Sequence, residues 1–227
     1  MDHYGCNPRL PGADTVTSDA IFQAEAARSL SGAACSTCRL RWKRAIDVVL
    51  GAIFLALCSP LLLLCWVAVR LTSAGPALHW SLRVGKDNLL FRMPKFRTMR
   101  VDTPQVATHL LTDPERYLTP IGPLLRKTSF DELPQLISVC TGDLSLVGPR
   151  PALFNQHDLV ALRTALGVHR LLPGVTGWAQ VNGRDELPIA LKARLDADYM
   201  REQSFCLDLK ILILTAWRVL TGKGVKH

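Results

Sequence analysis

The sequence predicts a mixed α and β protein, mostly helical with one short β-hairpin, held at a membrane by a helix-break-helix segment and by interfacial amphipathic helices. Three observations predict this fold: an uncharged apolar stretch from Val48 to Val69, alternating apolar residues between positions 78 and 93, and helical apolar patterns after residue 155. Hydrophobic residues make up 48% of the 227 residues and charged residues 20%, so burial can outweigh the chain entropy that folding costs. This length excludes a large multidomain enzyme.

The first 40 residues are rich in Ala, Ser, Gly and small polar groups, and they show neither the strand period nor the helix period. We therefore expect a disordered extension over residues 1–40. The apolar stretch that follows comes too late in the chain to be a secretory signal. Seven cysteines at irregular spacings indicate no disulfide framework.

The apolar stretch favours a re-entrant membrane hairpin over residues 41–72. As a helix rising about 1.5 Å per residue, it is long enough to span a bilayer. Ser59 and Pro60 lie at its middle, where proline removes a backbone donor and clashes with the preceding turn. Each arm then reaches only about half-way across a bilayer. A kinked spanning helix is the alternative, since neighbours and a serine hydroxyl can satisfy the freed carbonyls.

Basic residues flank the apolar stretch on both sides. Lys43 and Arg44 precede it and Arg70 follows it, and basic flanks stay preferentially in the cytoplasm. Both ends are therefore expected on one side of the membrane. Asp47 can pair there with Lys43 or Arg44, whereas at the bilayer centre it would cost about 2.5–3.5 kcal/mol. We therefore expect Asp47 at the membrane interface.

The chain carries a formal net charge of +8, and the basic excess lies between Arg39 and Arg100, around the apolar stretch. This distribution suits anionic lipids or phosphate-bearing ligands. A nucleic-acid groove would instead need basic stripes interleaved with aromatic residues. No nucleic-acid partner is expected.

The remaining elements follow from local patterns. Apolar and polar residues alternate over 78–84, turn residues occupy 85–88, and the alternation resumes over 89–93, which predicts the β-hairpin. Three cations follow within 95–100; such a run is usually a solvated edge unless a phosphate ligand lies nearby. Helices are expected at 155–166, 187–203 and 207–220. The last contains Trp217, and it fits an interfacial helix and a core helix equally well.

Two adjacent carboxylates, Asp131 and Glu132, are the first candidates for chemistry. Ser129-x-x-Glu132 is a capping-box pattern, so stabilisation of a helix N-terminus is the simplest explanation. Against it, a basic pair at 126–127 lies just upstream, and Arg150 follows between two prolines. Because the prolines fix the backbone, Arg150 is suited to a bidentate contact with a phosphate.

Five blocks of the sequence, in order, resemble those of the bacterial sugar transferases, the monotopic polyprenyl-phosphate phosphoglycosyl transferases. The resemblance covers nearly all of the chain from Lys43 to Val219. The blocks are Lys43-Arg44-x-x-Asp47 before the apolar stretch broken at Ser59-Pro60, Lys95-Phe96-Arg97-Thr98-Met99, residues 125–135 around Asp131-Glu132, residues 142–151 ending in Pro149-Arg150-Pro151, and residues 173–184.

The resemblance implies transfer of a sugar 1-phosphate from a UDP-sugar to polyprenyl (undecaprenyl) phosphate, with release of UMP. Asp131 is then the nucleophile that forms a covalent phosphosugar intermediate, and Glu132 helps to hold Mg²⁺. A carboxylate that attacks a phosphate approaches another anion, so a metal and fixed cations must neutralise charge. The expected substrate-binding residues are Lys95, Arg97, Arg126, Arg150, Gln180 and Arg184.

The resemblance also implies a place in the cell. The single hairpin, with Lys43, Arg44, Asp47, Ser59 and Pro60, is typical of the small members of the family. A catalytic domain over residues 73–227 is expected on the cytoplasmic face of the bacterial inner membrane. There it would catalyse the first membrane step in assembling a glycoconjugate such as an exopolysaccharide, O-antigen or glycoprotein glycan. The sequence does not name the sugar or the oligomeric state.

Two other functions compete with this one. A nucleotide-sugar glycosyltransferase would release UDP and would use Asp196-Ala197-Asp198 to hold its metal. In a helix, residues i and i+2 point about 200° apart, which disfavours a shared metal. A non-catalytic, membrane-anchored binding module would recruit acidic lipids or a partner without turnover.

Overall fold

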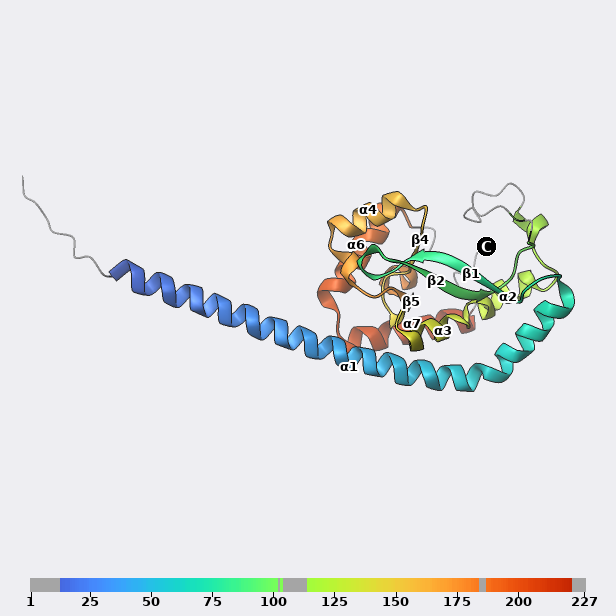
Figure 1. Cartoon of the computed structure of the whole chain (residues 1–227), viewed down its shortest axis with the longest axis horizontal. Helices are drawn as coiled ribbons and strands as arrows, with labels where there is room; N and C mark the ends of the chain where they lie inside the picture. The colour runs from blue at the N-terminus through green and yellow to red at the C-terminus, as the bar shows by residue number, and fades with distance from the viewer. Residues whose placement is uncertain (1–12, 102, 104–113, 184–186, 222–227) are drawn as a thin grey trace, which may run out of the picture. The chain divides into compact units, whose positions relative to one another are not determined.

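The computed structural model describes residues 13–101, 103, 114–183 and 187–221. They form a mixed α and β structure, mostly helical, as the sequence predicts (Figure 1). It contains two small sheets, where the sequence predicted one hairpin. The chain divides into two compact units, Met1–Ala45 and Ile46–His227. The boundaries expected at residues 40 and 72 stay predictions, and α1 (Ala13–Thr72) begins inside the stretch expected to be disordered.

Helix α1 continues through Pro60, so the expected break is a bend within one helix. Figure 1 shows α1 bending in its cyan part, the segment that contains Pro60. Proline has no N–H to donate to the carbonyl four residues earlier, and here that carbonyl, Ala56 O, accepts the Ser59 hydroxyl instead at 2.8 Å. The serine therefore replaces the hydrogen bond that the proline removes, and the helix bends without ending.

One face of the apolar part of α1 is open and the other is packed. Within Arg41–Thr72 the most apolar stretch has a mean hydropathy of 2.7, and among the described residues this is the one helix long and apolar enough to cross a membrane. Leu57 and Leu71 are exposed on it, whereas Cys65 and Val69 are buried. The packed face contacts the remainder of the unit that begins at Ile46.

The predicted hairpin is confirmed. Strands β1 (Leu78–Val84) and β2 (Leu90–Phe96) pair antiparallel, and η1 (Lys86–Asn88) forms the turn between them. The short β4 (Ala152–Leu153) pairs with the other edge of β1, so the order is β2-β1-β4. A second sheet joins β3 (Ser145–Val147) and β5 (Gly174–Thr176) in parallel.

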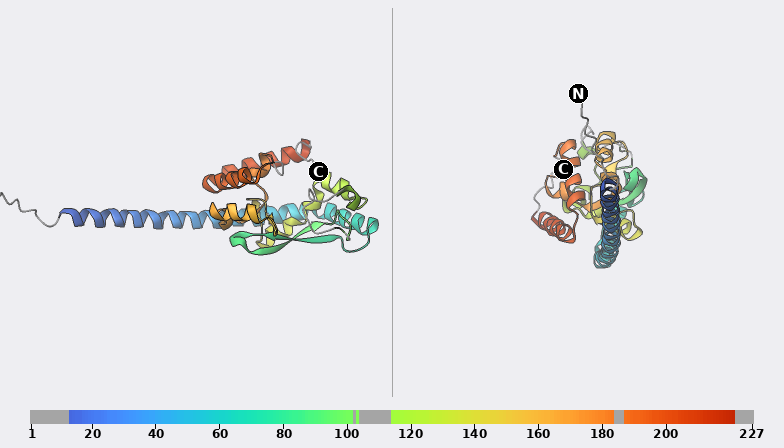
Figure 2. Two further views of the ribbon diagram at one scale, coloured as in Figure 1. Left: turned by 90° about the horizontal axis from the view of Figure 1, so that it is seen from above. Right: turned by 90° about the vertical axis from the view of Figure 1, so that its left-hand side faces the viewer.

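The other elements of this unit are helices. The expected helices at 155–166, 187–203 and 207–220 correspond to α4 (His157–Ala165), α6 (Ile189–Glu202) and α7 (Phe205–Thr221). The other helical elements are η3 (Pro114–Tyr117), α2 (Gly122–Thr128), η4 (Phe130–Glu132), α3 (Gln135–Thr141), η5 (Val168–Arg170) and α5 (Trp178–Val181). Figure 2 shows α7, in red, and the β1–β2 hairpin, in green, on opposite sides of this unit.

The sequence fits both a core helix and an interfacial helix at α7, and the structure shows a buried face and an exposed apolar face. Ile211 is fully buried, and it belongs to the main core cluster with Met93, Val139 and Tyr199. On another face Ile213 and Trp217 are more than half exposed. The helix is therefore part of the core and also presents an apolar surface.

The two ends of the apolar stretch of α1 attach to the same folded unit. Near its start, the buried Asp47 carboxylate accepts hydrogen bonds from Ser145 Oγ at 2.7 Å and from Leu146 N at 3.3 Å. Near its end, Val69 belongs to a second core cluster with Phe96 of β2. Asp47 thus anchors α1 to β3, a contact that the sequence did not indicate, and its expected position at the membrane interface stays a prediction.

Candidate active site

Asp131 and Glu132 lie in a tight turn between two helices. Helix α2 ends at Thr128, Ser129 takes the left-handed conformation with φ 59°, and η4 follows at once. The N–H of Ser129 donates to Arg126 O at 3.0 Å, so Ser129 closes α2, and its side chain makes no capping bond. The Ser129 side chain therefore does not form the capping box that the sequence spacing indicates, although both carboxylates lie in the first turn of η4.

The Asp131 carboxylate is buried among charged groups. Only 9% of the residue is exposed, and η4 packs against β2 and α2, which carry Lys95 and Arg126. The pKa of Asp131 is raised to about 6, first by burial and then by the neighbouring Glu132 carboxylate, while Lys95 and Arg126 act in the opposite direction. A carboxylate in this setting is ionised at neutral pH but only weakly hydrated, as suits a nucleophile.

The two cations beside Asp131 are themselves constrained. Burial lowers the pKa of Lys95, with Arg83 adding to the effect, while Asp131 and Glu132 oppose it. Burial also lowers the pKa of the Arg126 guanidinium, and Asp131 again opposes the shift. The Nε of Arg126 donates to Thr98 Oγ1 at 3.0 Å, which directs its guanidinium. Two of the expected phosphate-binding cations are thus brought to the nucleophile.

Arg150 reaches the same site through Glu132. Its Nη2 atom lies 2.9 Å from Glu132 Oε1, and both side chains are partly exposed. The ion pair joins the Asp-Glu turn to the segment Pro149–Pro151, which lies far from it in sequence. The structure therefore unites five of the residues expected to act together: Asp131, Glu132, Lys95, Arg126 and Arg150.

Arg97 lies elsewhere. Its Nη2 donates to Ser73 Oγ at 2.8 Å and to Ser73 O at 3.2 Å, just beyond the end of α1. The residue is buried, and among the described residues its Nε and Nη1 atoms have no hydrogen-bond partner. In this structure Arg97 ties β2 to the end of the apolar helix, and its role in binding substrate stays a prediction.

Gln180, in α5, is also buried. Its Nε2 donates to Val175 O at 3.0 Å, and its Oε1 has no partner among the described residues. It therefore packs against the backbone of β5. Arg184, the other residue expected from this block, lies outside the described residues.

The two acids of Asp196-Ala197-Asp198 do not share a site. Asp196 is 1% exposed, and its Oδ2 lies 2.6 Å from Arg163 Nη2. Asp198 is an exposed partner of Arg201 on the same helix. The two carboxylates bind different arginines, which removes the pair of metal ligands that the glycosyltransferase alternative requires.

Most of the chain matches the sequence model of one protein family. The model of the family described as bacterial sugar transferase matches residues 38–222. The chain belongs to the bacterial sugar transferase family. This confirms the resemblance that the five sequence blocks carry.

Three relatives illustrate where this sugar transferase stands within the family. It is 44% identical over 186 residues to an uncharacterized sugar transferase, EpsL, of Bacillus subtilis, covering 82% of this chain and 90% of that protein. It is 39% identical over 190 residues to the UDP-glucose:undecaprenyl-phosphate glucose-1-phosphate transferase of Escherichia coli, covering 80% of this chain and 41% of the relative. It is 36% identical over 190 residues to the UDP-N-acetylgalactosamine-undecaprenyl-phosphate N-acetylgalactosaminephosphotransferase of Aeromonas hydrophila, covering 81% of this chain and 45% of the relative. The sugar transferase thus spans less than half of the two relatives whose names state a substrate.

Sequence reasoning missed two residues around this site. Arg163 contacts the backbone of Arg150, and Arg83 contacts that of Pro151. Both are single arginines within a helix or strand pattern, and they lie 13 and 68 residues from their partners. Since a local pattern carries no sign of such distant contacts, the sequence offered no signal for them.

Proposed function

We propose that this sugar transferase moves a sugar 1-phosphate from a UDP-sugar to undecaprenyl phosphate and releases UMP, as a first step in polysaccharide assembly. The observation that carries the proposal is the buried Asp131 carboxylate beside Glu132, Lys95 and Arg126. The names of the E. coli and A. hydrophila relatives state this reaction class with two different sugars. The sugar itself is therefore left open.

Asp131 acts as the nucleophile in this proposal. One carboxylate oxygen bonds to the sugar-bearing phosphorus of the donor, the bond to the bridging oxygen breaks, and UMP leaves. An oxygen of the acceptor phosphate then bonds to the same phosphorus and frees the Asp131 carboxylate. The bond between the anomeric carbon and its oxygen stays intact in both steps, so the sugar keeps its anomeric configuration.

The cations around Asp131 would stabilise the charge that accumulates on phosphorus. Two anions must approach each other, and in a low-dielectric site the repulsion is large unless fixed positive groups oppose it. Lys95 and Arg126 already act on Asp131 in this sense, since both lower its pKa. Arg150, 2.9 Å from Glu132, is placed to contact the donor diphosphate when Glu132 turns to another partner.

The carboxylates fit the Mg²⁺ ion that the resemblance implies. Mg²⁺ usually takes one or two protein carboxylates and completes its ligands with water and substrate phosphates, and in the described residues no group of three or more potential ligands gathers. Glu132 raises the pKa of Asp131 by like-charge repulsion, so a cation would relieve that repulsion. We assign Glu132 as the protein ligand; the bound ion would neutralise charge on the donor phosphates.

We further propose a monotopic placement with both ends of the apolar helix on the cytoplasmic face. Asp47 and Val69, at opposite ends of the stretch, are both packed into the same folded unit. A helix that crossed the bilayer would place these two ends on opposite faces, about 30 Å apart. The exposed apolar side chains of α1 and α7 then face lipid, which supports a site at the depth of the acceptor phosphate.

Product analysis tests the proposed function. Purified protein is incubated with a panel of UDP-sugars, undecaprenyl phosphate and Mg²⁺, and the released nucleotide is identified. We expect UMP, and we expect a phosphosugar attached to Asp131 when the acceptor is omitted. Release of UDP would support the glycosyltransferase instead. Absence of any nucleotide release would support the binding module.

A further inference from the structure

Three consecutive carbonyl groups of the Pro149–Pro151 segment accept hydrogen bonds from three different elements. Pro149 O accepts the N–H of Gly174 in β5 at 2.9 Å. Arg150 O accepts Nη1 of Arg163 in α4 at 2.8 Å. Pro151 O accepts Nη1 of Arg83 in β1 at 3.3 Å. With the φ angles of both prolines already restricted, little freedom is left to the backbone that carries Arg150.

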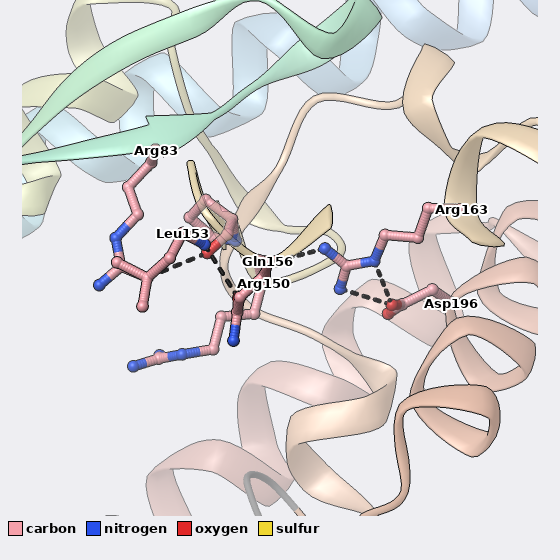
Figure 3. A network of polar contacts seen from close by, with 7 residues as sticks. Arg83, Arg150, Leu153, Gln156, Arg163 and Asp196 are labelled. Carbon is pink, nitrogen blue, oxygen red and sulfur yellow. Dashed lines mark hydrogen bonds and ion pairs between the residues drawn. The ribbon is translucent and has the colours of Figure 1, made fainter. Parts of the chain in front are cut away.

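Arg163, which donates to Arg150 O, is itself fixed by an ion pair with Asp196. Figure 3 shows Arg163 between the backbone of Arg150 and the carboxylate of Asp196. The Nε and Nη2 atoms of Arg163 donate to Asp196 Oδ2 at 2.9 and 2.6 Å, and Asp196 is almost fully buried in α6. Since two donors of the planar guanidinium are held by Asp196, the direction of its Nη1 toward Arg150 O is fixed.

The side chain of Arg150 points the other way. In Figure 3 it extends away from Arg163, and its Nη2 lies 2.9 Å from Glu132 Oε1. Arg163 and Asp196 therefore act on the backbone of Arg150 and leave its guanidinium to the active site. Neither of them contacts Asp131 or Glu132 among the contacts of the described residues.

We propose that Arg163 and Asp196 are positioning residues, which fix the backbone of Arg150 so that its guanidinium is held at Glu132 and at the donor phosphates. The expected effect on turnover rests on the proposed function, whereas the expected effect on the backbone of Arg150 does not. It also gives Asp196 a role that differs from metal binding. A group displaced by about 1 Å can lose about a hundredfold in rate, which is the kind of loss that this pair would prevent.

The test replaces the whole ion pair. Removing one partner would leave an uncompensated buried charge and could unfold the protein, whereas replacing both by apolar residues of similar volume is often neutral for stability. Arg163→Met combined with Asp196→Leu therefore keeps the packing between α4 and α6 but removes the donor to Arg150 O. Arg163→Lys is the second variant: it keeps a positive charge opposite Asp196, but its single nitrogen replaces the fork of donors that joins Asp196 to Arg150 O. Asp198→Asn, on the same helix but with an exposed partner, is the matched control.

Two quantities are measured in each protein. The first is UMP release, from which we expect kcat to fall about tenfold or more in the double variant, with KM for the UDP-sugar within about threefold, because positioning acts on the transition state. Arg163→Lys is expected to lower kcat in the same way, and Asp198→Asn is expected to match the wild type. A wild-type kcat in the folded double variant, or in Arg163→Lys if the double variant does not fold, would overturn the inference.

The second quantity is amide hydrogen exchange in the peptide that covers residues 148–153, which requires no turnover. We expect exchange there to be about tenfold faster in the double variant than in Asp198→Asn, because local opening becomes easier once the backbone contact is lost. Unchanged exchange would overturn the inference. If the wild type releases no UMP, the proposed function fails, and the exchange measurement still decides whether the pair holds this segment.

Discussion

Asp131→Asn is expected to abolish UMP release and, at the same time, to stabilise the protein. The reason is the position of the carboxylate. Burial and the charge of Glu132 raise the pKa of Asp131 from 3.8 to about 6 in the folded state, despite the opposing effect of Lys95 and Arg126. An ionised Asp131 is thus less favourable in the folded chain than in the unfolded one. An asparagine has the same shape and carries no charge to be buried.

The size of the effect follows from the two pKa values. A difference of about two units, at 1.36 kcal/mol per unit, corresponds to about 3 kcal/mol. Between pH 3.8 and about 6 the folded state holds a proton that the unfolded state has released, so wild-type stability falls as the pH rises through this window. The Asn variant has no group that ionises at position 131, so it does not lose this part of the stability as the pH rises. Its advantage should be absent near pH 4, grow up to about pH 6 and then stay constant.

The assay is thermal or denaturant unfolding of both proteins in the same detergent, at pH values from 4 to 8. At about 2–4 °C per kcal/mol for a chain of this size, the Asn variant should melt about 6–12 °C higher at pH 8. The exposed Asp143 serves as control, since Asp143→Asn should leave unfolding unchanged at every pH. A variant at Asp131 that is no more stable than the wild type at pH 8 would refute the burial argument.

Four further outcomes are expected. The wild-type kcat/KM for the UDP-sugar should fall about tenfold per pH unit below about pH 6, because Asp131 must be ionised to attack; a flat profile down to pH 5 would contradict this. Asp47→Ala should lower the free energy of unfolding by about 1–3 kcal/mol in a denaturant titration, since it leaves the buried Leu146 N–H without its carboxylate acceptor while Ser145 Oγ can still donate to Val147 O, whereas a loss below about 0.5 kcal/mol would show that the anchor is dispensable. Gly174→Ala should prevent folding, detected as loss of soluble, monodisperse protein, because its Cβ would lie 2.1 Å from the backbone nitrogen of Gly148; a well-folded variant would contradict this geometry. Pro60→Ala should straighten α1 toward a spanning helix, checked by labelling both ends of the helix from each face of the membrane; native ends found on opposite faces would refute the monotopic placement.

Local patterns account for most of the secondary structure that the sequence predicted. The alternation over 78–93 becomes the β1–β2 hairpin, and the apolar periods after residue 155 become α4, α6 and α7 within about two residues. Both depend on neighbours in sequence. The adjacency of Asp131 and Glu132 could be noticed for the same reason.

The errors arose where a distant contact decides the outcome. Ser129 and Glu132 have the spacing of a capping box, but Ser129 closes the preceding helix and Glu132 binds Arg150, 18 residues away. The sequence offered Lys43 or Arg44 as possible partners of Asp47, and it gave no sign of the hydrogen bond from Ser145, 98 residues later. In each case the local pattern was present, and the contact that the structure adds comes from a residue distant in sequence.

A buried nucleophile such as Asp131 requires that the residues packed around it are held rigidly. The environment that makes Asp131 reactive, a buried carboxylate beside a second carboxylate, also makes its charge unfavourable by about 3 kcal/mol. A loosely packed turn would relieve that cost by opening to water, and the carboxylate would then be fully hydrated and unreactive. Packing of η4 against β2 and α2 and the ion pair from Glu132 to the fixed Arg150 oppose such opening. Excluding water from the ionised Asp131 therefore lowers the stability of the fold, and the wild type should be less stable than its inactive Asn variant.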